Sequence, residues 1–466
     1  MSKITYIGGD LIEEIGGSYK IFAKEGYEII SGKQIVFNAK EGIFYGEPEF
    51  PPLFSQPIKI IVQFRPHKEW KGEFGFDWFR LGDTMLFHDV AFPRIVSYQY
   101  HDYEFTEIVD DSKPDSINMH SGQFKPDEKM LNQLKQIYQP YTIPWKKIKN
   151  PKTGQLMAEE YFIPWMSILK DKEVNLTCIA EIKEDADYLE FPPSDYFTFT
   201  PNRIDVKGKK NVALNEENIT IKCIKEFEKD QTIELKAFKK DARGETIEAI
   251  AGKINVWAND ISKQKEKDVV FIQIKTPDFS RGERSPNVSN EKKRINYCLE
   301  QSYIKLSDQS DIVELDISKD KDFYNFITNN EIDKEKRLGG LDLEIYLKTK
   351  LKGRYGDKYN NHFKAFYFEE KGHRGKGEDL GGYSSDDSDF VVAFSGRDDQ
   401  TATHEILHSM GLAHTFTNKY TNPKALFTYM YQMTDNLMDY AEYESKGKRS
   451  SLYYWQWKII NNSIKK

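Results

Sequence analysis

Eleven residues close to the C-terminal end of the chain combine three imidazoles with one carboxylate at fixed spacing. Residues 404–414 read His-Glu-Ile-Leu-His-Ser-Met-Gly-Leu-Ala-His, and three of the chain's nine histidines lie in this string. The pattern is H-E-x-x-H-x-x-G-x-x-H, and its fixed positions are His404, Glu405, His408, Gly411 and His414. Neutral imidazoles are common zinc ligands, so the string predicts a site for one Zn²⁺ ion.

Helical geometry explains the first half of the pattern. On an α-helix, residues four apart lie on one face, so His404 and His408 can share a metal. Glu405 is rotated by about 100° from His404 and reaches the space beside the metal without being a ligand. We therefore expect His404 and His408 as ligands and Glu405 as the general base.

The second half of the pattern predicts the end of that helix. A helix over residues 399–410 would be capped by Ser395, Asp398 or Asp399 and would bury apolar side chains on one side. Gly411 can take the left-handed conformation that ends many helices. The chain can then turn sharply, which lets His414 return as the third ligand.

Three protein ligands leave the fourth zinc position open, and this arrangement is catalytic rather than structural. A structural site would be closed by four protein ligands, usually including cysteines. The chain's three cysteines, Cys178, Cys223 and Cys298, are isolated and distant from the motif. We expect none of them to be a ligand.

A second motif follows at residues 436–440, which read Asn-Leu-Met-Asp-Tyr. With the histidine motif it resembles the metzincin clan of zinc peptidases, most closely pappalysin-like and related bacterial members, over roughly residues 364–440. The resemblance implies that Met438 lies in a tight turn beneath the metal and that Tyr440 contacts the metal or the developing oxyanion. Taken alone, Met438 would be an ordinary core methionine.

The composition is that of an ordinary soluble protein. The chain has 466 residues, 39% of them hydrophobic, with a net charge of −7 and a pI near 5.9. These values favour neither a nucleic-acid nor an anionic-membrane partner. No apolar run approaches the about 18 residues of a membrane span, and the first residues lack the apolar stretch of a secretory signal. We expect a protein that is cytoplasmic when made, or exported by a route without a cleaved signal.

The pattern of elements predicts a multidomain protein. Short apolar runs such as residues 34–37 and 58–64 indicate a β-rich N-terminal domain over 1–154. Regularly spaced strand patterns from 174 to 258 favour an immunoglobulin-like β-sandwich over 155–265. From 266 to 466 strand and helix patterns alternate, which indicates an α/β (α+β) domain with a mostly parallel sheet. This agrees with the metzincin catalytic domain that the resemblance implies.

We expect zinc-dependent hydrolysis of peptide bonds in protein or peptide substrates. The resemblance implies that an extended substrate lies along the strand at residues 389–394. An alternative is a catalytically silent scaffold that acts as a binding protein. Residues 19–26 and 72–83 vaguely resemble leader regions of bacterial proteins associated with contractile (type VI) secretion machines. That resemblance implies a secreted effector with a peptidase domain.

Two further segments allow more than one interpretation. The aromatic cluster at residues 74–80 predicts a small β-domain core, or else a binding surface. The acidic, glycine-rich stretch at 378–389 predicts a solvated loop, or else a calcium site.

Overall fold

The structure is a computed structural model, and the chain divides into two compact units. The first unit comprises residues 1–57 and 240–247, and the second comprises 58–239 and 248–466. The structure describes residues 11, 16, 28–37, 58–84, 89–100, 124–149, 153–209, 212–241, 244–277, 288–375, 378–385, 388–397, 400–418, 422, 424–440 and 449–464.

In the first unit, the expected strand at residues 34–37 is wrong, because this stretch is exposed and has no regular structure. An apolar run forms a strand only where another element pairs with it and covers one face. The leader-like residues 19–26 lie outside the described part of the chain, so the prediction of an effector role stays a prediction.

In the second unit, two β-sheets face each other. One has the strand order β1-β8-β12-β10, and the other has the order β11-β9-β13-β14-β7-β2. In β8 (Glu173–Glu184) the buried and exposed positions alternate, as expected for a strand with one face on a core. The sheets approach each other closely at Gly252, where an added Cβ atom would lie 2.7 Å from the carbonyl oxygen of Val62. The remaining strands are β1 (Lys59–Pro66), β2 (Phe76–Asp77), β7 (Trp165–Met166), β9 (Tyr188–Glu190), β10 (Phe197–Thr200), β11 (Arg203–Asp205), β12 (Val212–Cys223), β13 (Gln231–Lys240) and β14 (Thr246–Val256).

These sheets draw strands from both sides of the boundary expected at residue 154. The strand β1, predicted at 58–64, pairs antiparallel with β8 over its whole length. The strand β2 pairs with β7 at the edge of the second sheet. The facing sheets match the predicted β-sandwich in outline, while its immunoglobulin-like character stays a prediction.

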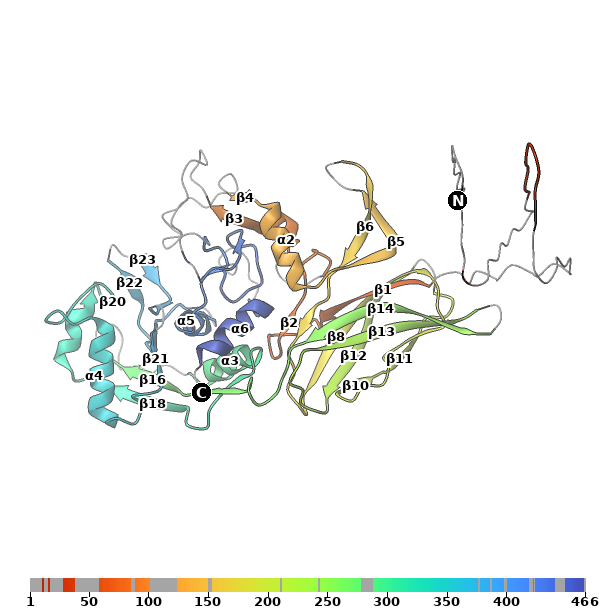
Figure 1. The fold of residues 1–466 in the computed structure, drawn as a ribbon. Helices are drawn as coiled ribbons and strands as arrows, with labels where there is room; N and C mark the ends of the chain where they lie inside the picture. The colour runs from red at the N-terminus through yellow and green to blue at the C-terminus, as the bar shows by residue number, and fades with distance from the viewer. Residues whose placement is uncertain are drawn as a thin grey trace. The chain divides into compact units, whose positions relative to one another are not determined.

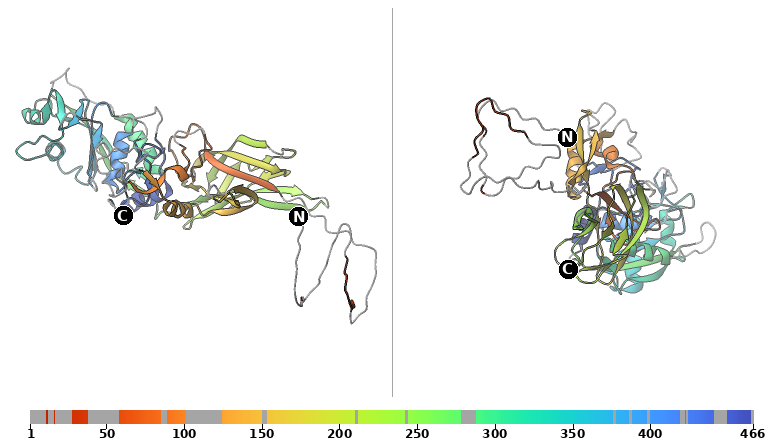
Figure 2. Two further views of the ribbon diagram at one scale, coloured as in Figure 1. Left: turned by 90° about the horizontal axis from the view of Figure 1, so that it is seen from above. Right: turned by 90° about the vertical axis from the view of Figure 1, so that its right-hand side faces the viewer.

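A five-stranded sheet with the order β18-β16-β21-β25-β24 carries the elements closest to the histidine motif. The first four strands are parallel to one another, as predicted, and β24 is antiparallel to β25. Figures 1 and 2 show the sandwich strands at one end of the second unit and this sheet, with α4 and α5, at the other. The elements of this part are β16 (Val269–Lys275), α3 (Ser289–Glu300), β18 (Asp311–Asp316), α4 (Leu343–Tyr355), β21 (Phe363–Tyr367), β24 (Gly382–Tyr383), β25 (Phe390–Ala393), α5 (Thr401–Ser409) and α6 (Tyr454–Ser463).

The acidic stretch at 378–389 is not the expected loop throughout, because it contains β24 and one strand of a smaller sheet. That smaller sheet has the order β19-β20-β22-β23. Within the described ranges, the group of side chains able to hold a metal ion includes none from this stretch. The smaller elements are β15 (Lys265–Lys267), β17 (Ile304–Leu306), a 3₁₀ helix (Lys321–Phe326), β19 (Ile327–Thr328), β20 (Glu331–Asp333), β22 (Gly372–Arg374) and β23 (Glu378–Leu380).

A segment expected to belong to the N-terminal domain also pairs with the C-terminal part of the chain. The strand β3 pairs antiparallel with β26 (Thr428–Tyr429), which lies between the two motifs. The helix α2 begins after Asp127, which caps it by accepting from two backbone amides. The other elements here are α1 (Phe92–Ile95), β3 (Val96–Tyr100), β4 (Phe124–Pro126), α2 (Glu128–Ile137) and the hairpin strands β5 (Tyr141–Lys149) and β6 (Leu156–Tyr161).

The aromatic cluster at residues 74–80 is core, as predicted, and the alternative of a binding surface is wrong. Trp78 is 1% exposed and Phe76 fully buried. The guanidinium of Arg80 stacks on the Trp78 ring at 3.3 Å and donates to Asp435 at 3.0 and 3.2 Å. Its other terminal nitrogen lies 3.4 Å from Asp77. A buried cation between two buried carboxylates therefore joins this cluster to the segment that precedes the second motif.

None of the helices within the described ranges is long and apolar enough to cross a lipid bilayer.

We expect Arg80→Met to lower the free energy of unfolding by about 3–5 kcal/mol, because it leaves two buried carboxylates without their cation. Arg203 also stacks on an aromatic ring, that of Tyr188, at 3.4 Å, but it is exposed. The control variant Arg203→Met should change the free energy of unfolding by about 0.5 kcal/mol or less. Urea denaturation measures both, and equal effects would contradict the assigned role of Arg80.

Candidate metal centre

The first two histidines lie on α5, close to the predicted bounds. Its backbone hydrogen bond from His404 N to Gln400 O measures 2.8 Å. Gln400 is the N-cap and makes no side-chain cap bond, so the expected cap by Ser395 is wrong. Asp398 and Asp399, the other cap candidates, lie outside the described residues. The helix buries Ile406 and Leu407 against the sheet and turns the two histidines to one side.

Gly411 ends the helix as predicted. Its φ is +92°, a conformation that is strained for residues with a Cβ atom, and its amide donates to His408 O at 2.9 Å. The chain reverses here and brings His414 back to the helix. The Nε2 atoms of His404 and His408 are 3.0 Å apart, as are those of His408 and His414, and those of His414 and His404 are 3.1 Å apart.

This triangle of nitrogens fits a single zinc ion. Tetrahedral coordination with Zn–N bonds of about 2.0–2.1 Å places the ligand nitrogens roughly 3.3 Å from one another. The observed separations are close to that value. Within the described ranges, His404, His408 and His414 form the group able to hold a metal ion, and it contains no cysteine, as expected.

Hydrogen bonds on the far side of the rings fix their tautomers. His404 Nδ1 donates to Leu437 O at 2.7 Å, and His408 Nδ1 donates to Leu412 O at 2.8 Å. Each ring then directs the lone pair of Nε2 towards the centre of the triangle. Burial lowers the pKa of His404 and of His414 well below the usual value, which favours the neutral form that binds metal.

The second motif forms a tight turn that is closed by its own polar side chains. Asn436 Oδ1 accepts from Met438 N at 2.9 Å, and Asp439 accepts from the amides of Gln432 and Thr434. Met438 is fully buried in the core cluster that includes Ile406 of α5. Met438 therefore shares a core with α5, and its role as a methionine turn beneath the metal stays a prediction.

Two aromatic side chains flank His414. The hydroxyl of Tyr440 lies 2.9 Å from His414 Nε2, the same nitrogen that faces the triangle. The ring of Phe416 stacks on the imidazole at a centroid distance of 4.7 Å and an interplanar angle of 9°. The structure thus brings Tyr440 to the histidines, while its contact with a metal or an oxyanion stays a prediction. It also adds Phe416, which the sequence did not single out.

Glu405 is half-buried on the same helix and faces the end of β24. The hydroxyl of Ser384 donates to the Glu405 carbonyl at 3.2 Å. Burial raises the pKa of the Glu405 carboxyl, and the charge of His408 and hydrogen bonds with Ser384 oppose this rise. Ser384 had no motif to mark it, because it belongs to a glycine- and serine-rich stretch.

Arg449 is a buried cation close to His404, and no sequence pattern marked this residue. Its Nη1 atom donates to Leu437 O at 3.1 Å and to Asp439 O, the carbonyls on either side of Met438. The same atom lies 3.2 Å from His404 Nδ1. Arg449 therefore helps to hold the turn against the first histidine.

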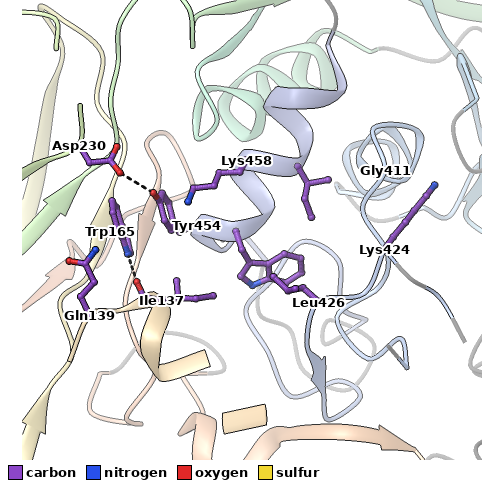
Figure 3. Close-up of a pocket in the computed structure, with 11 residues that line it drawn as sticks. Ile137, Gln139, Trp165, Asp230, Gly411, Lys424, Leu426, Tyr454 and Lys458 are labelled. Atoms are coloured by element: carbon purple, nitrogen blue, oxygen red, sulfur yellow. Dashed lines mark hydrogen bonds between the residues drawn. The ribbon is translucent and has the colours of Figure 1, made fainter. Parts of the chain in front are cut away.

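A cavity of about 780 Å³ lies beside α6 and shares Gly411 with the motif. Figure 3 shows Trp165 and Tyr454 in this cavity, with Lys458 near the tyrosine ring. Because no ligand histidine lines it, the cavity is distinct from the metal centre. It is lined by Ile137, Gln139, Trp165, Asp230, Gly411, Lys424, Leu426, Tyr454, Trp455, Lys458 and Ile459.

Comparisons with known proteins do not assign a family to the chain. No protein-family model and no curated protein matches the chain. Among solved structures, the crystal structure of archaemetzincin from Methanopyrus kandleri is similar, with 13% sequence identity over 44% of this chain and 98% of that one. The TM-score of 0.27 is too low to establish a shared fold.

Proposed function

We propose that the protein is a zinc-dependent endopeptidase. The observation that carries the proposal is the convergence of three imidazole Nε2 atoms within 3.1 Å of one another beside the carboxyl-bearing residue Glu405. His404, His408 and His414 would hold the ion and leave one coordination position open. Zinc in such a site lowers the pKa of water and polarises a carbonyl group.

Glu405 is proposed as the general base. Its carboxyl follows the first ligand on α5, which is the position from which it can accept a proton from the attacking water. Glu405 then returns this proton to the amine that leaves as the peptide C–N bond breaks. Its raised pKa supports this exchange, because a base must both take up and release the proton near neutral pH.

Tyr440 is proposed to donate a hydrogen bond to the oxyanion that develops on the scissile carbonyl. Support comes from the 2.9 Å separation between its hydroxyl and His414 Nε2, which keeps the phenol at the metal site. A preorganised donor at this position stabilises negative charge without having to reorganise during the reaction.

The substrate strand must differ from the one expected at residues 389–394. That strand is β25. The side of β25 that faces away from β21 is paired with β24, at Gly382↔Ala393 and Tyr383↔Val392. The edge of the sheet is β24. An extended peptide can add to a sheet only at an edge, so we propose that it binds along β24. The residue after β24 is Ser384, whose hydroxyl donates to the Glu405 carbonyl.

We expect Glu405→Ala to retain about one zinc ion per chain and to lose about 10²- to 10⁴-fold in kcat/KM, because the ligands remain while the base is removed. Metal analysis and digestion of an unfolded protein substrate measure the two quantities. The exposed carboxylate variant Glu266→Gln serves as the control and should cleave normally. Wild-type cleavage by Glu405→Ala would exclude this residue as the base.

Removal of metal tests the ligand assignment. We expect a chelator to abolish cleavage and about one equivalent of Zn²⁺ to restore it. His408→Ala should no longer bind zinc stoichiometrically, because one of three ligands is lost, whereas His67→Ala should bind it normally. His67 is half-exposed and pairs with Glu73 at 3.0 Å, away from the triangle. Full activity of the metal-free protein would refute the zinc proposal.

For Tyr440→Phe we expect kcat to fall by about 10²- to 10³-fold with little change in KM, because the lost donor acts mainly in the transition state. Tyr431→Phe is the matched control, since its ring packs edge-on at 6.1 Å from Tyr440. Steady-state kinetics with zinc-loaded variants gives both constants. If the two variants behave alike, Tyr440 has no special role in the reaction.

A further inference from the structure

Lys334 lies at a fixed position beside β24, the edge strand of the five-stranded sheet. It directly follows β20, which runs parallel to β22, and its backbone amide donates to His373 O at 3.1 Å, which continues the pairing by one residue. The strand β22 is itself held closely to the main sheet. At Gly372 an added Cβ atom would lie 2.4 Å from the ring of Phe394, the residue that follows β25. The backbone of Lys334 is thereby anchored close to β25, the strand that precedes α5.

The side chain of Lys334 lies over the edge strand. Its Nζ atom is 4.6 Å from the centroid of the Tyr383 ring, and Tyr383 is the second residue of β24. The next residue, Ser384, hydrogen-bonds with Glu405. The negative charge of Glu405 acts to raise the pKa of Lys334. Lys334 is therefore a cation at the junction of the substrate edge and the candidate base.

Within the part of the chain that the structure describes, no carboxylate is in direct contact with this ammonium group. Lys334 is half-buried, and burial lowers its pKa, as do the charges of Arg374 and Arg337. Glu335 and Glu405 act in the opposite direction. Among the described residues, its side-chain contact is the tyrosine ring and no carboxylate forms an ion pair with it. A partly desolvated cation without an ion pair is costly unless a ligand supplies the opposite charge.

We propose that Lys334 is a specificity-determining residue that binds an acidic side chain of the substrate, an aspartate or glutamate close to the scissile bond. This inference rests on the proposed peptidase function. A peptide added to β24 presents alternate side chains on the same face, so one of them can reach the ammonium group. The resulting charge-assisted hydrogen bond would be strong in a half-buried setting. A basic substrate residue at the same position would be repelled by Lys334 and its two arginine neighbours.

The test compares peptides that differ by one residue. A proteome-derived peptide mixture first identifies cleavage sites, and matched peptides with Glu or Gln at the selected position are then assayed. We expect the zinc-loaded wild type to cleave the Glu peptide about 10- to 100-fold faster in kcat/KM. Lys334→Met should remove this preference and Lys334→Arg should keep it. Lys334→Glu should reverse it in favour of a Lys peptide.

Lys336 provides the matched control, because it is an exposed lysine two residues away. Lys336→Met should keep the full preference for the Glu peptide. Cleavage by the wild type without an acidic preference, or a preference that survives in Lys334→Met, overturns the inference and leaves the peptidase proposal standing. If the zinc-loaded wild type cleaves none of the peptides, the peptidase proposal itself fails.

Discussion

The hydrogen bond from His404 Nδ1 to Leu437 O is the contact on which the site depends most. Three imidazoles can present lone pairs to one point only if each keeps its proton on the opposite nitrogen. For His404 the acceptor is a carbonyl of the second motif, 33 residues away. For His408 it is Leu412 O, just past the Gly411 turn. The metal centre therefore requires two backbone turns at fixed positions, one local and one distant.

The distant turn is held from several sides. Leu437 N donates to Ser451 O at 2.9 Å, and the side-chain amides of Asn436 and Gln456 bond reciprocally, which ties the turn to the start of α6. Just before it, Asp435 pairs with Arg80, 355 residues earlier in the chain. A segment far from the motif in sequence thus supports the carbonyl that orients the first ligand. Removal of the segment that carries Arg80 would disturb the candidate metal centre for this reason.

Features fixed by local chemistry were predictable from the sequence. The helix α5 follows from the spacing of its histidines, and the turn at Gly411 follows from the backbone conformation that glycine allows. The parallel strands around β16 follow from apolar runs. The order of strands at the sheet edge was not predictable. The strand β24 has only two residues, one of them glycine, so it has no periodicity to detect. Its pairing with β25 arises from tertiary placement, and it moves the proposed substrate edge to another segment.

The residues that sequence reasoning missed share one property: their role comes from burial and not from residue type. Lys334 lies in the charged run Glu-Ile-Asp-Lys-Glu-Lys-Arg, where composition alone predicts a solvated loop for every lysine. Lys334 directly follows β20, which pairs with β22, and it is half-buried, whereas Lys336 is exposed. Under the two proposals, the motif residues carry out peptide hydrolysis, and Lys334 selects the peptides that are cleaved. Because Lys334 lies outside the motif and packs on Tyr383 of β24, substrate preference can change while the ligands and the base stay the same.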